Sequence, residues 1–446
     1  MFQYAKSLWF DHSTRLNPPI RWGGFDFVVP QWAIGLSLAY IPLLAILSKT
    51  IFSSDASMLR IPDPSAPDYA DRLLNEKSYQ YCSVLNPLVT AFSAVVLYLL
   101  CIELGFSKSR ASAAALTFGL ISPAAVYAKL DFAQPLASLF LLLTFLFLLK
   151  ARLSGIANLA AAGACIGSTI LVRSEFVILA PILAVSVCLM PTAETFGGGS
   201  IRIVERLLVF AFAFGVLVFV NQAITFVKFG SWFTGYPLKY YLIFDARHWA
   251  TAFLANLISP GRGILLFCPL SILSVLGTRK LLATNVWFGT TLTTSLVIVF
   301  CFYPIWRAWD GGVSWGPRYL VPIVPYVCLL SHCALPSALS LRQKLVVGLL
   351  LVLQGVATLQ GVLFNFLEFY GSLGLSSAEF DRQFYHFWPM MSPLLAGWKA
   401  LIHPTNYDIK WLHLSSQTSI QSLFPFIVLV CFIGLTKIWC DFFQSS

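Results

Sequence analysis

Long apolar runs that hold almost no charged residues are the feature that most constrains how this chain can fold. Several of these runs approach or reach the roughly 20 residues that an α-helix needs to cross the hydrocarbon core of a bilayer. Charged residues make up 11% of the 446-residue chain, whereas a typical soluble domain carries about 25%. The sequence therefore predicts an all-α fold in the form of a polytopic bundle of transmembrane helices.

The apolar runs together predict a bundle of about 11–12 spans. The expected helices lie near residues 84–104, 111–128, 132–149, 155–172, 176–190, 207–227, 263–277, 284–304, 319–334, 343–366 and 421–440. One further apolar segment, residues 28–51, contains Pro30, Gln31 and Pro42. This segment either spans the bilayer or lies in its interface.

The distribution of basic residues predicts the orientation of the bundle. The cations of the short loops fall on one side of it: Lys108, Arg110, Lys150, Arg152, Arg202, Arg206, Arg279, Lys280, Arg342, Lys344 and Lys437. Basic loops mark the cytoplasmic side of a membrane protein. The opposite side receives residues 53–83, 129–131, 173–175, 228–262, 305–318 and 367–420. We therefore expect a multi-pass protein of the cytoplasmic (inner) membrane.

The polar segments do not indicate a separate soluble domain. None of them is long enough to build its own hydrophobic core, so residues 1–446 are expected to form a single membrane-embedded domain. Its expected parts are a partial first outer loop with interfacial segments (1–83), a transmembrane core (84–366), an aromatic-rich outer loop (367–420) and a last helix (421–440).

The stretch from residue 306 to residue 322 concentrates the side chains that carry chemistry. It holds three tryptophans, two arginines, one aspartate and three glycines between two apolar runs. Charges at a membrane boundary are costly unless they are paired or bind a ligand. Tryptophan suits the bilayer interface and also presents a flat apolar face for stacking. The stretch is thus either an interfacial anchor with a structural Arg–Asp pair or a binding site.

The predicted outer loop 228–262 is unusually basic for its side of the membrane. Its charged residues are Lys228, Lys239, Asp245, Arg247 and Arg262. Long loops escape the charge rule, so the excess has no necessary meaning. Alternatively, these cations meet an anionic ligand such as a lipid phosphate or pyrophosphate.

Neither cysteines nor histidines indicate a metal site. The ten cysteines include no C-x-x-C pair and the six histidines show no H-x-x-x-H spacing. The net charge of +10 fits cytoplasmic loops that face an anionic leaflet and does not indicate a nucleic-acid partner. Membrane lipids are the expected surroundings.

Five short segments resemble motifs of one enzyme class. They are Asp131–Leu136, Leu171–Glu175, Phe229–Tyr236, Ser259–Gly263 and Gly312–Pro322. The last reads G-V-S-W-G-P-R-Y-L-V-P and is similar to a G-x-x-x-G-P-R-Y-L-x-P motif that precedes a late helix. All five fall on the predicted outer face, in the order that the motifs have in that class. The chain thus resembles the GT-C class of integral-membrane glycosyltransferases, in particular bacterial relatives of protein mannosyltransferases and lipid A aminoarabinose transferases.

The resemblance implies the transfer of a sugar from a polyprenyl-phosphate donor to a lipid, glycan or protein acceptor at the extracytoplasmic face. Such a site needs a base for the acceptor hydroxyl, cations for the leaving phosphate and a platform for the sugar. The residues expected to bind donor and lipid phosphate are Arg318, Arg307, Arg262, Trp309, Trp315, Tyr319 and Tyr236. Some members of the class use a divalent ion, but no residue pattern here supports a metal or another cofactor.

Two departures from the class concern the catalytic base. Gln134 stands where the family has a glutamate. The class also places an aspartate in the first outer loop, and residues 1–8 resemble the helix that follows it. We therefore expect the first helix and its acidic residues to lie upstream of Met1. In the competing interpretation, residues 28–51 span the membrane and a different carboxylate acts. The candidate bases within this chain are Asp131, Asp310, Asp11 and Asp26.

Each assigned residue also has a purely structural interpretation. Arg318 could cap a helix start, Asp310 could pair with an arginine, Asp131 could cap a helix, and the aromatic residues could form an interfacial belt. Two other functions also stay open, a transporter or flippase of lipid-linked sugars and an inactive glycosyltransferase-like protein. A transporter of the repeat-built kind would show internal repeats or midplane charges, and the sequence shows neither.

Overall fold

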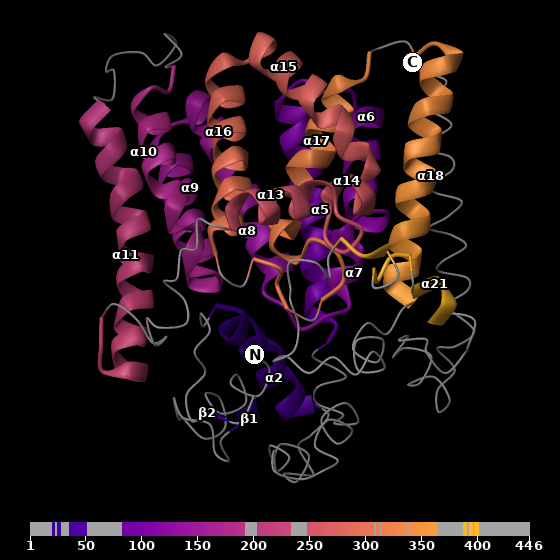
Figure 1. Ribbon diagram of the computed structural model, residues 1–446. Coiled ribbons are helices and arrows are strands. Elements are labelled where there is room, and N and C mark those ends of the chain that lie inside the picture. Colours follow the sequence, from indigo (N-terminus) through magenta and orange to yellow (C-terminus); the bar gives the residue numbers. More distant parts are fainter. Residues whose placement is uncertain are drawn as a thin grey trace. The chain divides into compact units, whose positions relative to one another are not determined.

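Helices dominate the part of the protein that the structure describes. The computed structural model describes residues 20–22, 25–27, 35–50, 83–191, 203–232, 248–306, 309–312, 314–336, 339–363, 387–389, 392–395 and 397–400. Within these ranges the only strands are a short antiparallel hairpin, β1 (Ile20–Trp22) with β2 (Phe25–Phe27), and the other regular elements are helical (Figure 1). The predicted helical membrane fold is confirmed.

Five helices among the described residues are long and apolar enough to cross a membrane. They are α5 (Leu85–Glu103), α8 (Gln134–Ser154), α11 (Ile203–Phe229), α16 (Val286–Phe302) and α18 (Leu341–Leu363). Shorter apolar helices accompany them: α2 (Gly35–Thr50), α9 (Ile156–Val172), α10 (Ala180–Cys188), α13 (Trp249–Ile258) and α17 (Val324–Ala334). The expected helix at 421–440 lies outside the described residues, and the total of about 11–12 spans stays a prediction.

The chain divides into two compact units. The first comprises residues 1–90 and 127–243, and the second comprises residues 91–126 and 244–446. The expectation of one membrane-embedded domain stays a prediction.

In the first unit, α9 contacts both α8 and α11. Two glycines one helical turn apart allow the close approach of α11. A Cβ atom on Gly163 would lie 2.4 Å from the Phe210 carbonyl oxygen, and one on Gly167 would lie 2.8 Å from Leu217 Cβ. Small residues at i and i+4 are a common means of bringing membrane helices together, because they let dispersion contacts form between the backbones.

The outer surface of α11 is apolar and exposed. Its exposed side chains are Ile203, Val204, Leu208, Phe212, Val216, Phe219, Phe226 and Val227. An apolar helix surface of this kind suits contact with lipid tails, and the 27-residue length of α11 exceeds the minimum for a span.

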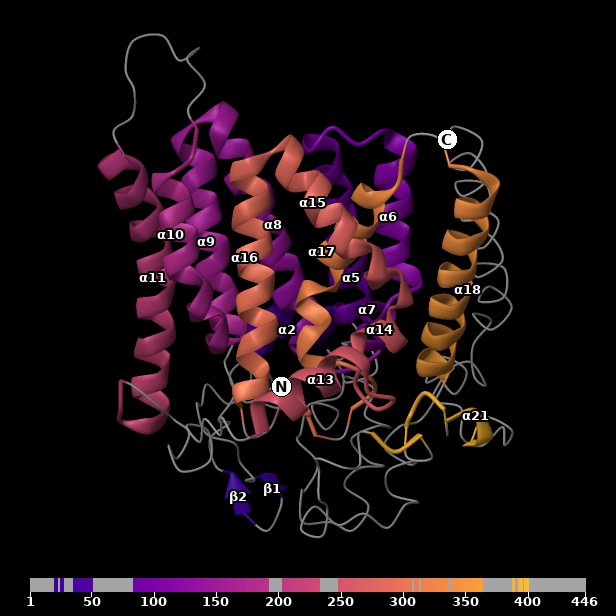
Figure 2. The ribbon, with the colours of Figure 1, turned by 45° about the horizontal axis from the view of Figure 1, so that its top comes forward.

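In the second unit, α17 is the most enclosed helix. Every residue from Val324 to Cys333 is buried. Helix α17 contacts α15 (Ser274–Thr284) and α6 (Lys108–Leu120), and Figure 2 shows α15, α16 and α17 side by side. The contact with α15 is tight, since a Cβ atom on Gly277 would meet the Leu330 carbonyl oxygen at 1.7 Å.

Proline interrupts two helices that the sequence analysis expected to be continuous. The expected helix 263–277 consists of α14 (Ile264–Phe267), the 3-10 helix η4 (Pro269–Leu273) and α15. Cys268 precedes Pro269 and leaves the helical region with φ −141° and ψ 67°, because the proline ring disfavours helical backbone in the residue before it. The expected helix 111–128 is likewise split into α6 and α7 (Pro123–Ala128), and Ser122 Oγ accepts a hydrogen bond from Ala124 N at the new start.

Two buried glutamines connect α18 to the rest of the second unit. Gln354 accepts a hydrogen bond from Leu270 N at 3.2 Å and donates one to the Ile121 carbonyl at 2.6 Å. Gln360 accepts from Trp315 Nε1 at 2.9 Å and donates to the Pro393 carbonyl at 2.8 Å. Gln360 therefore links this apolar helix to the stretch that the sequence analysis singled out.

Candidate functional site

The predicted site residues divide between the two units. Asp131 belongs to the first unit, and the second contains Arg262, Trp309, Asp310, Trp315, Arg318 and Tyr319. Asp11, Tyr236 and Arg307 lie outside the described residues. For Asp26 the structure describes only the backbone, in β2, where it pairs with Arg21.

Three glycines shape the loop from Trp309 to Arg318, which we call the glycine loop. Gly311, Gly312 and Gly316 have φ values of 72°, 63° and 61°. This left-handed region is open to glycine at little cost and is unfavourable for other residues. The loop therefore turns sharply, and several of its carbonyl groups point toward a single side chain.

That side chain belongs to Arg262, which is 1% exposed and therefore almost fully buried. Its Nη1 donates to the Ser314 carbonyl at 2.6 Å, to Ser314 Oγ at 2.7 Å and to the Gly316 carbonyl at 2.8 Å. Its Nη2 donates to the Gly312 carbonyl. These oxygens replace water around a buried cation, which would otherwise be very costly to enclose.

A tight turn before α14 presents Arg262 to the loop. Gly263 N donates to the Ser259 carbonyl at 2.7 Å, and Arg262 N donates to Ser259 Oγ at 3.0 Å. A Cβ atom on Gly263 would lie 2.5 Å from Ile258 C, so this turn needs glycine. Two of the five motifs, Ser259–Gly263 and Gly312–Pro322, are thus in direct contact.

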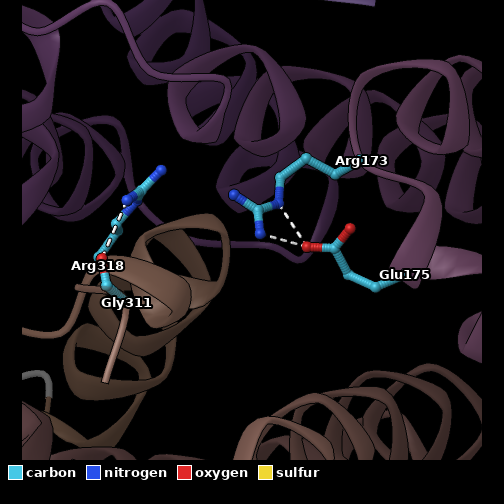
Figure 3. Close-up of polar contacts among 4 residues, drawn as sticks. All are labelled: Arg173, Glu175, Gly311 and Arg318. Atoms are coloured by element: carbon cyan, nitrogen blue, oxygen red, sulfur yellow. Dashed lines mark hydrogen bonds and ion pairs between the residues drawn. The ribbon is translucent and has the colours of Figure 1, made fainter. Parts of the chain in front are cut away.

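Arg318 has a different environment from Arg262. It is half-buried, at the start of the 3-10 helix η6 (Arg318–Ile323), and its Nη1 donates to the Gly311 carbonyl at 3.0 Å (Figure 3). Its guanidinium carbon lies 5.8 Å from the centre of the Tyr319 ring, a cation–π distance. Arg318 therefore combines a fixed position with partial access from outside the protein.

Next to Arg318, three rings form a group that we call the aromatic cluster: Tyr303, Trp306 and Tyr319. The Tyr303 and Tyr319 rings stack at 4.8 Å with an interplanar angle of 8°. The Trp306 ring lies 5.6 Å from Tyr319. Tyr303 is buried, whereas Trp306 and Tyr319 are partly exposed.

The sequence analysis assigned no role to Tyr303 or Trp306. One signal was available for Trp306, which opens the stretch 306–322. Nothing in the sequence indicated that the end of α16 would lie next to the start of η6, so the stacking of Tyr303 on Tyr319 could not be predicted from it.

The two other tryptophans of the glycine loop lie in the core. Trp315 is fully buried, meets the Phe267 ring edge-on at 4.7 Å and donates to Gln360. Trp309 is 5% exposed and clusters with Ala252 and Ala255 of α13. Both rings therefore pack in the core of the second unit, and their predicted part in ligand binding stays a prediction. Asp310, in the same loop, is 7% exposed.

The segment around Ser392 also contacts this region. Ser392 Oγ donates to the Pro260 carbonyl in the turn that carries Arg262, and Pro393 receives the hydrogen bond from Gln360. Within the described part of the predicted outer loop 367–420, Ser392 therefore contacts the turn that carries Arg262.

In the first unit, the turn that carries Asp131 is held from two helices. Tyr40 of α2 donates to Asp131 Oδ1 at 2.7 Å. Asn86 of α5 is 2% exposed and donates to the carbonyl oxygens of Leu130 at 2.5 Å and Phe132 at 3.0 Å. Ala133, not Asp131, is the N-cap residue of α8.

An ion pair occupies the Leu171–Glu175 segment of the first unit. Arg173 Nε donates to Glu175 Oε1 at 2.6 Å (Figure 3), and both side chains are largely buried. Arg173 is the C-cap residue of α9 and Glu175 lies in the first turn of the following 3-10 helix. The pair therefore fixes the bend between α9 and α10.

The described residues contain no group of three or more His, Cys, Asp or Glu side chains arranged to hold a metal ion.

Comparison with known proteins finds a likeness in structure but none in sequence. No family model and no curated protein matches the sequence. Among solved structures, the chain is similar to the crystal structure of ArnT from Cupriavidus metallidurans bound to undecaprenyl phosphate, with a TM-score of 0.45 and 15% sequence identity. The likeness covers 84% of this chain and 60% of that one, so the chain spans less than two thirds of the length of that protein.

Proposed function

We propose that the protein is a membrane glycosyltransferase of the GT-C class that moves a sugar from a polyprenyl-phosphate donor to a lipid, glycan or protein acceptor at the extracytoplasmic face of the inner membrane. One observation carries this proposal. The glycine loop holds a partly exposed arginine, Arg318, beside the partly exposed Trp306 and Tyr319 of the aromatic cluster, between two apolar helices. A cation beside flat rings at the end of a membrane helix suits a ligand that joins an anion, a ring and an apolar chain.

Arg318 is the proposed ligand of the donor phosphate. A planar guanidinium can donate two parallel hydrogen bonds to a phosphate, and such charge-assisted bonds are stronger than neutral ones. Its contact with the Gly311 carbonyl holds the guanidinium in place before the ligand arrives. Trp306 and Tyr319 would then offer their faces to the sugar or to the first isoprene units.

Asp131 is the proposed general base. As the acceptor hydroxyl attacks the anomeric carbon, the carboxylate takes its proton, the bond from that carbon to the phosphate oxygen breaks, and polyprenyl phosphate leaves. The hydrogen bond from Tyr40 would fix the carboxylate orientation during this step. Asp310 and Asp11 stay as the other proposed bases of this chain.

The test is a transfer assay on the full chain in lipid nanodiscs, with a panel of polyprenyl-phosphate sugars and mass spectrometry of the products. We expect Asp131→Asn to abolish transfer while the donor still binds. We expect Arg318→Met to weaken donor binding, whereas Arg279→Met, at an exposed arginine of α15, leaves it unchanged.

Two results would count against the proposal. Donor binding without turnover by the unaltered chain would indicate the inactive glycosyltransferase-like protein. Equal donor affinity for the unaltered chain and the Arg318→Met variant would remove Arg318 from the site.

A further inference from the structure

We propose that Arg262 is a positioning residue, which does not touch the ligand but holds Arg318 in place through the glycine loop. The proposal rests on the proposed function, because it concerns how the same phosphate site is kept in its binding geometry. It assigns different roles to two arginines that the sequence analysis had treated alike.

The burial of Arg262 separates it from any ligand that reaches the surface. Its side chain is 1% exposed, and both terminal nitrogens donate to oxygens of the glycine loop. A phosphate could reach this guanidinium only if the loop opened and gave up the contacts to Ser314 and Gly316. Arg318, by contrast, is partly exposed in the same structure.

Adjacent peptide groups connect the two arginines. The carbonyl of Gly311 accepts a hydrogen bond from Arg318, and the carbonyl of Gly312 accepts one from Arg262. Both glycines have positive φ angles, so the loop bends between these two acceptors. When Arg262 fixes the Gly312 peptide, it also limits the rotation of the Gly311 carbonyl, which in turn holds the Arg318 side chain.

The chemistry of this contact requires a guanidinium group. Arg262 reaches the carbonyls of Gly312, Ser314 and Gly316 and the Ser314 hydroxyl from two nitrogens in one plane. Lysine has one compact ammonium group, which cannot present donors from two separated nitrogens in a planar fork. We therefore expect Arg262→Lys to loosen the loop although it keeps the charge.

A double-mutant cycle distinguishes positioning from direct contact. The probe is farnesyl phosphate, with farnesol as the control that has the same tail but no phosphate. We expect Arg318→Met to weaken farnesyl phosphate binding about 10- to 100-fold, since it removes a charge-assisted hydrogen bond. Arg262→Met should weaken binding about tenfold on its own. In the Arg318→Met background it should have almost no further effect, within about twofold, because residues that act as one unit are not additive.

The outcomes separate this inference from the function on which it rests. If the two losses multiply, Arg262 contributes independently of Arg318 and the positioning role is overturned. If Arg318→Met leaves farnesyl phosphate binding equal to that of the unaltered chain, both the phosphate site and the inference are overturned. Farnesol binding is expected to be the same in all variants.

A second measurement follows the loop itself and does not depend on any ligand. Hydrogen exchange read by mass spectrometry should show faster exchange in a peptide covering residues 309–320 in both Arg262→Lys and Arg262→Met, with unchanged exchange in α16. Arg279→Met is the matched control. Ser314→Ala removes one hydrogen-bond acceptor of Arg262 and keeps the guanidinium, so it serves as the test variant if the Arg262 variants fail to fold. Unchanged exchange at 309–320 in the variants would overturn the inference.

Discussion

The close contact between Gly361 of α18 and Trp315 of the glycine loop leads to a prediction about stability, for which another glycine of the same helix supplies the control variant. A Cβ atom at Gly361 would lie 2.5 Å from Trp315 Cε2, 2.7 Å from Trp315 Cζ2 and 2.8 Å from Val126 Cγ2. These distances are far below ordinary van der Waals contact. Gly361→Ala must therefore displace the indole ring.

The indole ring has little freedom to move away. It is fully buried, its Nε1 donates to Gln360 at 2.9 Å, and it forms a T-shaped pair with the Phe267 ring at a centroid distance of 4.7 Å. Overpacking of a well-packed core typically costs about 1–3 kcal/mol. Because the displaced ring is also anchored by a hydrogen bond worth about 1 kcal/mol, we expect a loss near the upper end of that range, about 2–3 kcal/mol.

The same helix supplies the control. Gly348 has nothing within 4 Å of the position of a Cβ atom, so Gly348→Ala adds no clash. In a helix interior, alanine is favoured over glycine by about 0.5–1 kcal/mol because it reduces the conformational entropy of the unfolded chain. The two substitutions are chemically identical and should change stability in opposite directions.

The assay is unfolding in a graded mixture of a mild detergent and SDS, followed by tryptophan fluorescence, with apparent unfolding free energies compared among the three proteins. Hydrogen exchange in residues 309–320 should also rise in Gly361→Ala and not in Gly348→Ala. Equal stability of the two variants would refute the reasoning, because it would mean that Trp315 is not held against α18 as the structure describes.

Three further predictions concern the first unit. Tyr40→Phe, which removes the hydrogen bond to Asp131, should lower kcat for transfer and leave the affinity for the donor unchanged. Kinetic assays that show an altered donor affinity with an unchanged kcat would contradict this. Asn86→Leu leaves two carbonyl groups of the Asp131 turn without their donor and should lower the unfolding free energy by about 1–3 kcal/mol in the same titration. An unchanged midpoint would show that the Asn86 amide does not stabilise this turn. Gly163→Val should separate α9 from α11 and lower the unfolding midpoint, while Gly215→Val, at an open position of α11, should not; similar midpoints for the pair would rule out the close helix contact.

Much of the helical framework could be predicted from the sequence, because the signal for a membrane helix is local. A run of about 20 apolar residues is sufficient to indicate a span, and α5, α8, α11 and α18 lie within a few residues of their expected positions. Helix α13 was missed because it has only ten residues and lies in a segment with loop-like charges. The expected helix 263–277 was wrong as one continuous element, since Pro269 and the packing of the pieces around α17 decide where it breaks.

For the candidate site, the sequence by itself determined which residue types are present and which short motifs they form. The glycines at 311, 312 and 316 were visible as part of the stretch 306–322, and Arg262 and Arg318 were visible as cations near a predicted outer face. Only the tertiary structure decided which arginine is enclosed and which reaches the surface. The reason is that the acceptors of Arg262 lie 50 to 54 residues further along the chain, so its burial depends on a contact that no local pattern encodes.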